Sequence, residues 1–281
     1  MNDPLHFSLG RVGVIAGNAF LEAVRQRVFV FMTLLAAALV VGSLGLRELN
    51  FGASEGKFIA DFGHGALVLF GSVLTIVTAV QLLGGELENR TVLTVLAKPV
   101  HRSEFLCGKF LGTWLVVLVF CTLVTALLAL VLWVRTPGIP MDAAGEAPAA
   151  AMTAVPLGGV VLAGVLQAVK FGLLTAMVLL IASFAQTNLF ALATSFLVLV
   201  VCHLQYLARD SWHTGHGWSE RVGGGLIGLV FPNFQLFGFG EYLDAGAGAL
   251  WPMTGRIVTY GLVYTVVFLA LAVWSFRRRE I

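Results

Sequence analysis

The chain has 281 residues, of which 58% are hydrophobic and 11% are charged, and its mean hydropathy is +0.92. Because a soluble globular domain carries about 25% charged residues, this composition excludes that class and makes the bilayer the expected solvent. The net charge of +2 at pH 7 is too small to indicate a nucleic-acid partner.

The first expected element is an interfacial helix over residues 8–27. Its apolar residues recur at spacings of three and four, and Arg11, Glu22, Arg25 and Arg27 supply its charges. This pattern is typical of a helix that lies along a membrane surface. The alternative is an early extension of the first membrane span.

Six apolar runs are long enough to cross a bilayer, which takes about 20 residues per helix. They predict an all-α membrane protein with six transmembrane helices in a single domain over residues 1–281. The expected spans cover about residues 28–46, 66–83, 110–134, 157–185, 189–207 and 257–276.

Residues 84–112, between the second and third spans, hold the densest group of charges in the chain. Glu86, Glu88 and Arg90 lead into a short amphipathic run. This run ends at Lys98-Pro99, since proline disfavours a helical conformation in the residue before it. The pattern predicts a short helix and a sharp turn outside the membrane.

A new helix is expected directly after this turn. Ser103 is its predicted N-cap, and Glu104 lies in its first turn, where the helix dipole favours an anion. Gly108 and Gly112 then fall on one face of the helix, a spacing that allows another backbone to come close.

Lys170 is the one ionisable residue near the middle of a predicted span. Such a charge is costly in the bilayer, by about 2.5–3.5 kcal/mol, and normally faces protein or water. Gln167 lies one turn earlier on the same face. We expect both to line a translocation path, and the alternative is a structural ion pair or a lysine that reaches the membrane surface.

The apolar run at residues 226–239 is too short to span a bilayer and is broken by Pro232-Asn233. A run of this length suits a re-entrant or interfacial segment before the sixth span. Broken backbone at membrane depth is tolerated only where it is buried in protein or lines a cavity.

The sequence carries no clear motif for catalysis or metal binding. The sequence has no G-x-x-x-x-G-K-[ST] motif, because Phe110 follows Gly108-Lys109 and Ser103 stands where the leading glycine should be. His213 and His216, with His203 upstream, form a weak copper or zinc pattern, for which a solvated loop is the alternative. We therefore expect no catalytic residue and no metal site.

The distribution of basic residues predicts the orientation, since cytoplasmic loops carry an excess of lysine and arginine. The side that holds the termini has Arg11, Arg25, Arg27, Arg90, Lys98, Arg102, Lys109, Arg277, Arg278 and Arg279. The other side has Arg47, Lys57, Arg135, Arg209, Arg221 and Arg256. Both termini and residues 84–112 are therefore expected in the cytoplasm.

Residues 84–112 resemble the permease subunits of ABC-2 type transporters. The likeness rests on Glu86, Arg90, Thr91, Leu93, Leu96, Ala97, Lys98, Pro99, Val100, Arg102, Glu104, Phe105, Gly108, Lys109, Phe110, Leu111 and Gly112. Residues 18–27 and Asp61-Phe62-Gly63 resemble one branch of the same family. Beyond about the first 115 residues, only the pattern of spans agrees.

The resemblance implies that this segment is a cytoplasmic coupling helix that docks on a separate ATPase subunit. The residues it assigns to ATPase coupling are Glu86, Glu88, Arg90, Thr91, Leu93, Leu96, Lys98, Pro99, Val100, Arg102 and Glu104. It also implies that short external helices before the sixth span help to close an outer gate, with Pro232, Asn233 and Glu241 as its residues here.

The expected function is a permease subunit, with no enzyme activity of its own, that couples ATP hydrolysis to outward transport across the plasma membrane, the inner membrane of a bacterium. The expected partners are two ABC ATPase subunits, which bind ATP and Mg²⁺, a second permease subunit and membrane lipid. A homodimer is favoured over a heterodimer.

Two other classes of protein remain as alternatives. A secondary transporter or channel should carry several intramembrane charges or inverted repeats. A membrane anchor for a cytoplasmic complex would need neither Lys170 nor the broken segment at residues 226–239.

Overall fold

The computed structural model describes residues 7–45, 55–88, 100–135, 156–214, 225, 228–238 and 247–279. All elements of this part of the chain are helical. They are α1 (Leu9–Val24), α2 (Arg27–Gly42), η1 (Ser43–Gly45), α3 (Glu55–Glu88), α5 (Arg102–Arg135), α6 (Leu157–Phe184), α7 (Asn188–Thr214), η4 (Phe234–Phe237) and α10 (Ala247–Arg278).

The described helices include six that are long and apolar enough to cross a membrane, which confirms the predicted all-α architecture. These spans are Arg27–Gly45, Gly56–Glu88, Arg102–Arg135, Leu157–Phe184, Asn188–Leu207 and Met253–Arg278. The second begins earlier than expected, because hydropathy marks only the stretch inside the bilayer and the helical hydrogen bonds continue beyond it. The third is continuous with the helix expected to start at Ser103.

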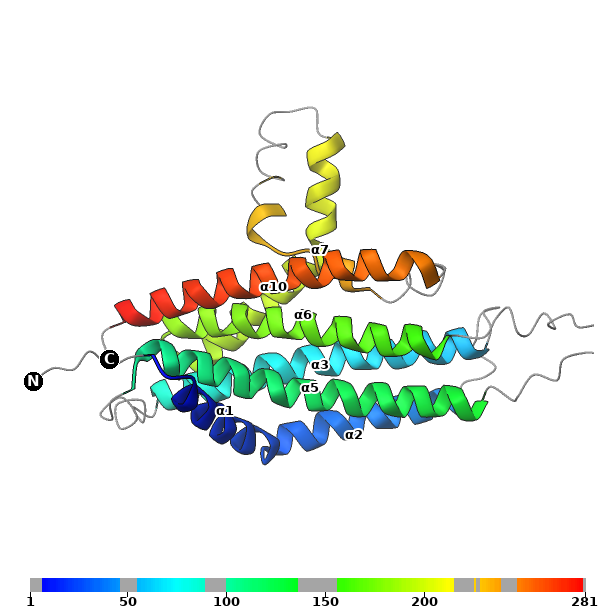
Figure 1. Ribbon diagram of the computed structural model, residues 1–281, viewed down its shortest axis with the longest axis horizontal. Coiled ribbons are helices and arrows are strands. Elements are labelled where there is room, and N and C mark those ends of the chain that lie inside the picture. The colour runs from blue at the N-terminus through cyan, green and yellow to red at the C-terminus, as the bar shows by residue number, and fades with distance from the viewer. Residues whose placement is uncertain are drawn as a thin grey trace, which may run out of the picture.

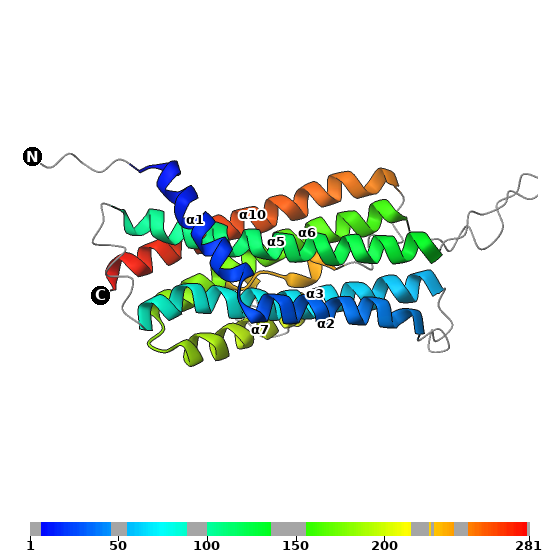
Figure 2. The same ribbon diagram turned by 90° about the horizontal axis from the view of Figure 1, so that it is seen from below.

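Five of the long helices, α2, α3, α5, α6 and α10, run along the long axis of the molecule (Figure 1). α7 lies obliquely against them, and its last part projects away from the bundle. α1, the end of α3, the start of α5 and the last turn of α10 gather at one end (Figures 1 and 2). We call this the terminal end of the bundle.

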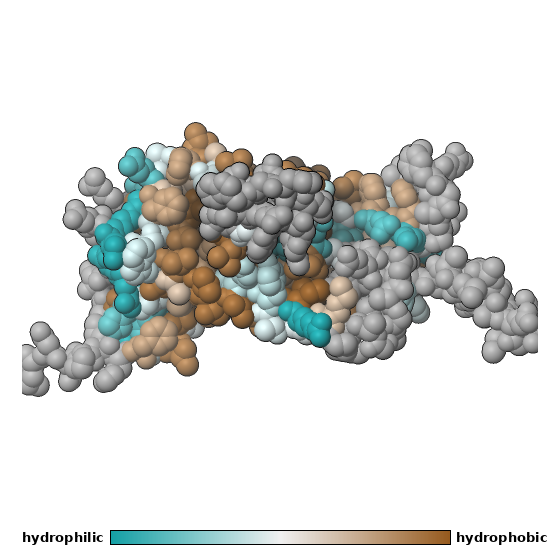
Figure 3. Space-filling model, turned by 90° about the horizontal axis from the view of Figure 1, so that it is seen from above, coloured by the Kyte–Doolittle hydropathy of each residue, from teal (hydrophilic) through white to brown (hydrophobic). Residues whose placement is uncertain are grey.

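α6 is the central helix of the bundle. In its most apolar window 83% of the residues are buried, against 22% in each of α2, α7 and α10. The outer helices therefore present apolar side chains such as Phe31, Leu197 and Val266 outward, as lipid-facing helices do. In the space-filling view, hydrophobic surface adjoins the hydrophilic residues at the terminal end (Figure 3).

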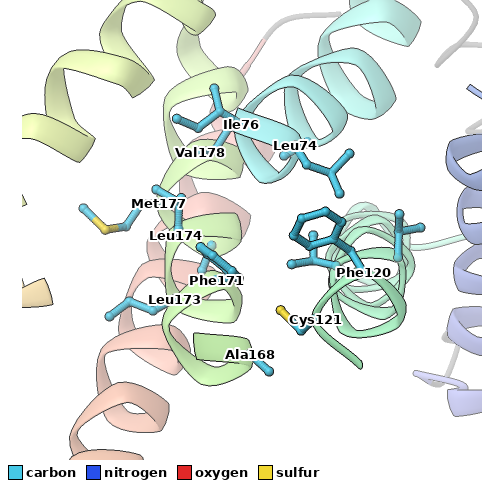
Figure 4. Packing of buried hydrophobic residues seen from close by; sticks show 14 of the residues in the cluster. Leu74, Ile76, Phe120, Cys121, Ala168, Phe171, Leu173, Leu174, Met177 and Val178 are labelled. Atoms are coloured by element: carbon cyan, nitrogen blue, oxygen red, sulfur yellow. The ribbon is translucent and has the colours of Figure 1, made fainter. Parts of the chain in front are cut away.

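The core of the bundle lies where α3, α5 and α6 meet. Phe120 of α5 and Phe171 of α6 are both fully buried, with Leu74 of α3 beside them (Figure 4). Gly71 of α3 makes room for these rings, since a Cβ at this position would lie 2.4 Å from Phe171. Size matching of this kind lets helices pack closely where no hydrophobic driving force acts between them.

α1 is separate from the first span, so the alternative of an early extension of that span is wrong. It crosses α5 at an angle (Figure 2), and its buried residues are Val12, Ala16, Ala19 and Ala23. The two glycines of α5 are the reason for the close contact. A Cβ at Gly108 would lie 2.6 Å from Ile15, and one at Gly112 would lie 2.5 Å from Ala19 and 2.8 Å from the Ala16 carbonyl oxygen.

We expect Gly112→Ala to destabilise the packing of α1 on α5. The added methyl group would meet backbone atoms of α1, which cannot move as a side chain can, and overpacking of this kind costs about 1–3 kcal/mol. The change is measured by unfolding the purified chain in micelles with increasing denaturing detergent.

Gly65→Ala is the matched control, because a Cβ there meets nothing within 4 Å. This control should unfold like the wild type or slightly later, since alanine favours a helix over glycine. Equal stability of the two variants would contradict the close contact between α1 and α5.

Candidate functional site

The predicted ATPase-coupling residues fall into two groups. Arg90, Thr91, Leu93, Leu96, Lys98 and Pro99 lie outside the described residues, so their predicted roles stay predictions. Glu86, Glu88, Val100, Arg102 and Glu104 are described, and they flank the undescribed part, residues 89–99, on both sides. All but Val100, which packs against the core, have polar contacts within the chain.

Glu104 is completely buried and joins α1 to the first turn of α5. Its Oε1 accepts hydrogen bonds from the backbone N–H of Ser8 at 2.6 Å and from Nη2 of Arg11 at 2.8 Å. Its Oε2 accepts from the backbone N–H of His101 at 3.0 Å. The carboxylate thus neutralises a guanidinium and satisfies two backbone donors.

Glu104, predicted as an ATPase-coupling residue, forms contacts inside the chain, where N–H groups of Ser8, Arg11 and His101 surround its carboxylate. One expectation about the start of α5 is corrected. Ser103 was expected to cap α5, but it lies within the helix, which begins at Arg102. The Glu104 carboxylate instead binds the N–H just before the helix, as the glutamate of a capping box does.

Lys109 forms a second ionic contact at the terminal end. Its side chain is 5% exposed, and its Nζ lies 2.6 Å from Oε1 of Glu86 and 3.9 Å from Oε2 of Glu22. It therefore joins α5 to the last turns of α3 and to α1. Glu86, predicted as a rim charge for the partner, contributes to the packing of this chain through this contact.

The remaining contacts hold the ends of α6 and α10. Arg102 donates hydrogen bonds to the carbonyl oxygens of Arg277 at 3.1 Å and Arg279 at 3.0 Å. Arg279 donates to the carbonyl oxygen of Ser183 at 3.0 Å, near the end of α6. These guanidinium groups satisfy carbonyls that a helix end leaves without an intrahelical partner.

Glu88 accepts a hydrogen bond from Nδ2 of Asn188, which joins the end of α3 to the start of α7. With the contacts above, each side of residues 89–99 is attached to several helices by polar interactions. Arg11, Lys109, Asn188 and Arg279 were not predicted as site residues, because their partners lie 23 to 100 residues away in the sequence.

A second polar cluster lies in the middle of the bundle, around Gln167 and Lys170 of α6. Both are buried, with exposed fractions of 1% and 3%. Lys170 lies about 20 Å from either end of α6 at the rise of about 1.5 Å per residue. The structure therefore places both residues inside this chain, rather than on an outer surface that faces a partner.

The cluster draws on α3, α6, α7 and η4. Nζ of Lys170 lies 3.2 Å from Nε2 of His203 and 5.4 Å from the centre of the Phe234 ring. Nε2 of Gln167 lies 3.2 Å from Nε2 of His64 and donates to the Phe237 carbonyl oxygen at 2.8 Å. This arrangement was not predictable from spacing, since the two histidines belong to other helices.

Hydrogen bonding assigns the tautomer of His203. Its Nδ1 lies 2.9 Å from the carbonyl oxygen of Leu199, which can only accept, so Nδ1 carries a proton. Its Nε2 is then the acceptor for Lys170. A neutral imidazole, and not a carboxylate, is therefore the hydrogen-bond partner of this buried ammonium group.

The broken segment at residues 228–238 packs against this cluster. Its backbone groups are satisfied by side chains of neighbouring helices: the Asn233 N–H donates to Oη of Tyr260 at 2.9 Å, and Oη of Tyr264 donates to the Leu229 carbonyl oxygen at 3.1 Å. Since Phe234 contacts Lys170, the segment reaches the depth of the middle of α6. This fits the re-entrant form of the prediction.

The predicted gate residues are placed in part. Pro232 and Asn233 are buried, and the Oδ1 of Asn233 accepts a hydrogen bond from the Gln235 N–H at 2.9 Å. Glu241 lies outside the described residues. The side chains of His213 and His216 also lie outside them, and the described part holds no group of three or more histidine, cysteine, aspartate or glutamate side chains that could bind a metal.

An apolar hollow of about 340 Å³ opens between α5 and α6. Thr125, Gly164 and Ala168 are among its lining residues. Ala168 lies two positions from Lys170 and so on a different face of α6, which separates this hollow from the polar cluster.

We expect Glu104→Gln to lower the unfolding free energy of the purified chain by about 1–3 kcal/mol, because an amide cannot replace a buried carboxylate that accepts from N–H groups of three residues. Glu22→Gln is the control, since that side chain is 53% exposed and 3.9 Å from Lys109. Denaturing-detergent titrations of both variants measure the difference. Equal stability would contradict the buried contact between α1 and α5.

The comparison with protein families agrees with these elements. A family model described as ABC-2 family transporter protein matches residues 14–207. These residues include most of α1, the first five spans, and the residues that α5 and α6 contribute to the two polar clusters. A search of curated proteins found no match. The matched region is more than half of the 281 residues. The chain therefore belongs to the ABC-2 transporter family and is a multi-pass membrane protein of the permease type.

Proposed function

We propose that this chain is the permease subunit of an exporter and that it transmits the motion of a separate ABC ATPase to the membrane spans. The observation that carries the proposal is the attachment of both sides of residues 89–99 to the bundle. Glu86 on one side is paired with Lys109, and Arg102 on the other side binds the end of α10. A push on residues 89–99 would therefore move several spans together.

The ATPase would supply the chemistry, because the chain has no P-loop motif. ATP and Mg²⁺ would bind to two copies of that subunit. The contact surface would lie within residues 89–99, where Arg90 and Lys98 provide charge and Leu93 and Leu96 provide an apolar centre, the usual composition of an interface.

A second permease subunit would complete the transport path, and we favour a second copy of this chain. α2, α7 and α10 are the least buried spans, so their apolar faces are open to lipid or to another subunit. The excess of arginine and lysine on the side of the termini supports a cytoplasmic terminal end. The membrane would be the plasma membrane, the inner membrane of a bacterium.

Co-purification tests the partner. The wild-type chain, extracted from its native membrane in mild detergent, should bring an ABC ATPase subunit with it. The double variant Arg90→Glu, Lys98→Glu should lose at least about nine-tenths of that subunit, since like charges at a contact cost several kcal/mol. Glu86 is left unchanged because its reversal would also break the contact with Lys109.

Arg256→Glu is the matched control, since this exposed residue lies on α10 at the opposite end from Arg277. It should retain the ATPase. A wild-type chain that purifies without an ATPase would favour the carrier, channel or anchor alternatives. Retention of the ATPase by the double variant would contradict the docking surface.

Reporter fusions test the orientation. A green fluorescent protein fused after Ile281 should fluoresce, and alkaline phosphatase fused there should be inactive, because the first matures in the cytoplasm and the second outside it. Alkaline phosphatase inserted at Ala149, in the segment between α5 and α6, should be active. The reverse result would place the terminal end outside.

A further inference from the structure

Among the described residues two lysines, Lys109 and Lys170, are buried, and different groups lie next to their charges. The whole Lys109 residue is 4% exposed, and its Nζ lies 2.6 Å from Oε1 of Glu86. Lys170 is 3% exposed and has an imidazole nitrogen at 3.2 Å and an aromatic ring at 5.4 Å. Among the described residues, no carboxylate forms an ion pair with Lys170.

A buried ammonium group without a counter-charge is unfavourable. Taking such an ion out of water costs several kcal/mol, and an anion of good geometry is what offsets this cost. A neutral acceptor and a cation–π contact offset only part of it, with the latter contributing about 2 kcal/mol when desolvated. Within the part of the chain that the structure describes, the cluster is thus one negative charge short of balance.

The cluster also has unused hydrogen-bonding capacity. Lys170 has three N–H donors, and His203 accepts only one of them. On the same face of α6, Oε1 of Gln167 is buried and has no hydrogen-bond partner in the described part of the chain. The surroundings are apolar, with Phe234 and Phe237 fully or almost fully buried.

We propose that Lys170 binds the anionic group of the transported molecule, and that this molecule is an amphiphile with a carboxylate or phosphate head and an apolar body. The charge of the head completes the balance at Lys170, and Gln167 accepts a hydrogen bond from a head that carries an N–H or O–H. Phe234 and Phe237, in the broken segment at residues 228–238, contact the apolar body of the molecule. This proposal rests on the proposed transport function, because the bound molecule is cargo only if the chain is a transporter. The binding itself can be tested without the ATPase.

The test uses the purified chain in nanodiscs of phosphatidylcholine, a lipid without net charge. Decanoate and decyl phosphate are the anionic probes, and decanol and decyltrimethylammonium are the neutral and cationic ones. Binding is measured by the rise in the thermal unfolding midpoint as each probe is titrated. The same chain in discs that contain phosphatidylglycerol shows whether a lipid head serves as the anion.

Both anionic probes should stabilise the wild type and Lys170→Arg, which keeps the charge. Their apparent affinity for Lys170→Met should fall by about tenfold or more, the loss of at least about 1.4 kcal/mol of binding free energy. Decanol and decyltrimethylammonium should not distinguish the wild type from Lys170→Met. Stabilisation of the wild type by phosphatidylglycerol, absent in Lys170→Met, would identify a lipid as the source of the anion.

Variants of the two lysines test whether Lys170, unlike Lys109, has no counter-charge. Lys170→Met should unfold at the same temperature as the wild type or higher, because it removes an unbalanced charge. Lys109→Met should unfold earlier, because it leaves Glu86 without its cation.

Equal binding of decanoate to the wild type and Lys170→Met would overturn the proposal, as would equal binding of decanoate and decanol to the wild type. A loss of stability in Lys170→Met as large as that in Lys109→Met would show that Lys170 has a structural counter-charge. A failed co-purification of the ATPase would leave these binding results unchanged, so the two proposals can fail separately.

Discussion

No water is available in the hydrocarbon region of a bilayer, so each polar group there must find its partner within the protein. The broken segment at residues 228–238 shows this constraint most clearly. Its backbone leaves helical geometry at Pro232, and Tyr260, Tyr264 and Gln167 supply the hydrogen bonds that a regular helix would have made for itself. The segment can lie at the depth of Lys170 only because two helices, α6 and α10, carry these side chains toward it.

At the terminal end, buried polar groups find their partners through charged side chains. The buried Glu104 holds α1, Lys109 holds the end of α3, and Arg102 holds α10. All three belong to α5, which makes this helix the common attachment point for its neighbours. The glycine spacing on α5 then places the backbone of α1 close enough for the Glu104 contacts to form. Packing and electrostatics therefore support each other here.

The sequence predicted the features that depend on local pattern. The six spans follow from hydropathy, and the close contact at Gly108 and Gly112 follows from a spacing of four. Local sequence pattern could not predict the pairings between distant residues. Arg11 and Glu104 are 93 positions apart, and His64 and Gln167 are 103 apart, and neither position carries a local signal for its partner. Ser103 is not the cap because α5 begins one residue before it, and Glu104 accepts from the N–H of His101 at the helix start.

The contact between Arg102 and the end of α10 has a consequence for how the bundle is assembled during synthesis. The donor is the first residue of the third span, and its acceptors lie at the end of the sixth span, 175 and 177 residues later. Until those residues leave the ribosome, the guanidinium of Arg102 and the end of α6 lack these partners. The first five spans can insert one after another, but the terminal end closes in a single late step, when the sixth span reaches its place.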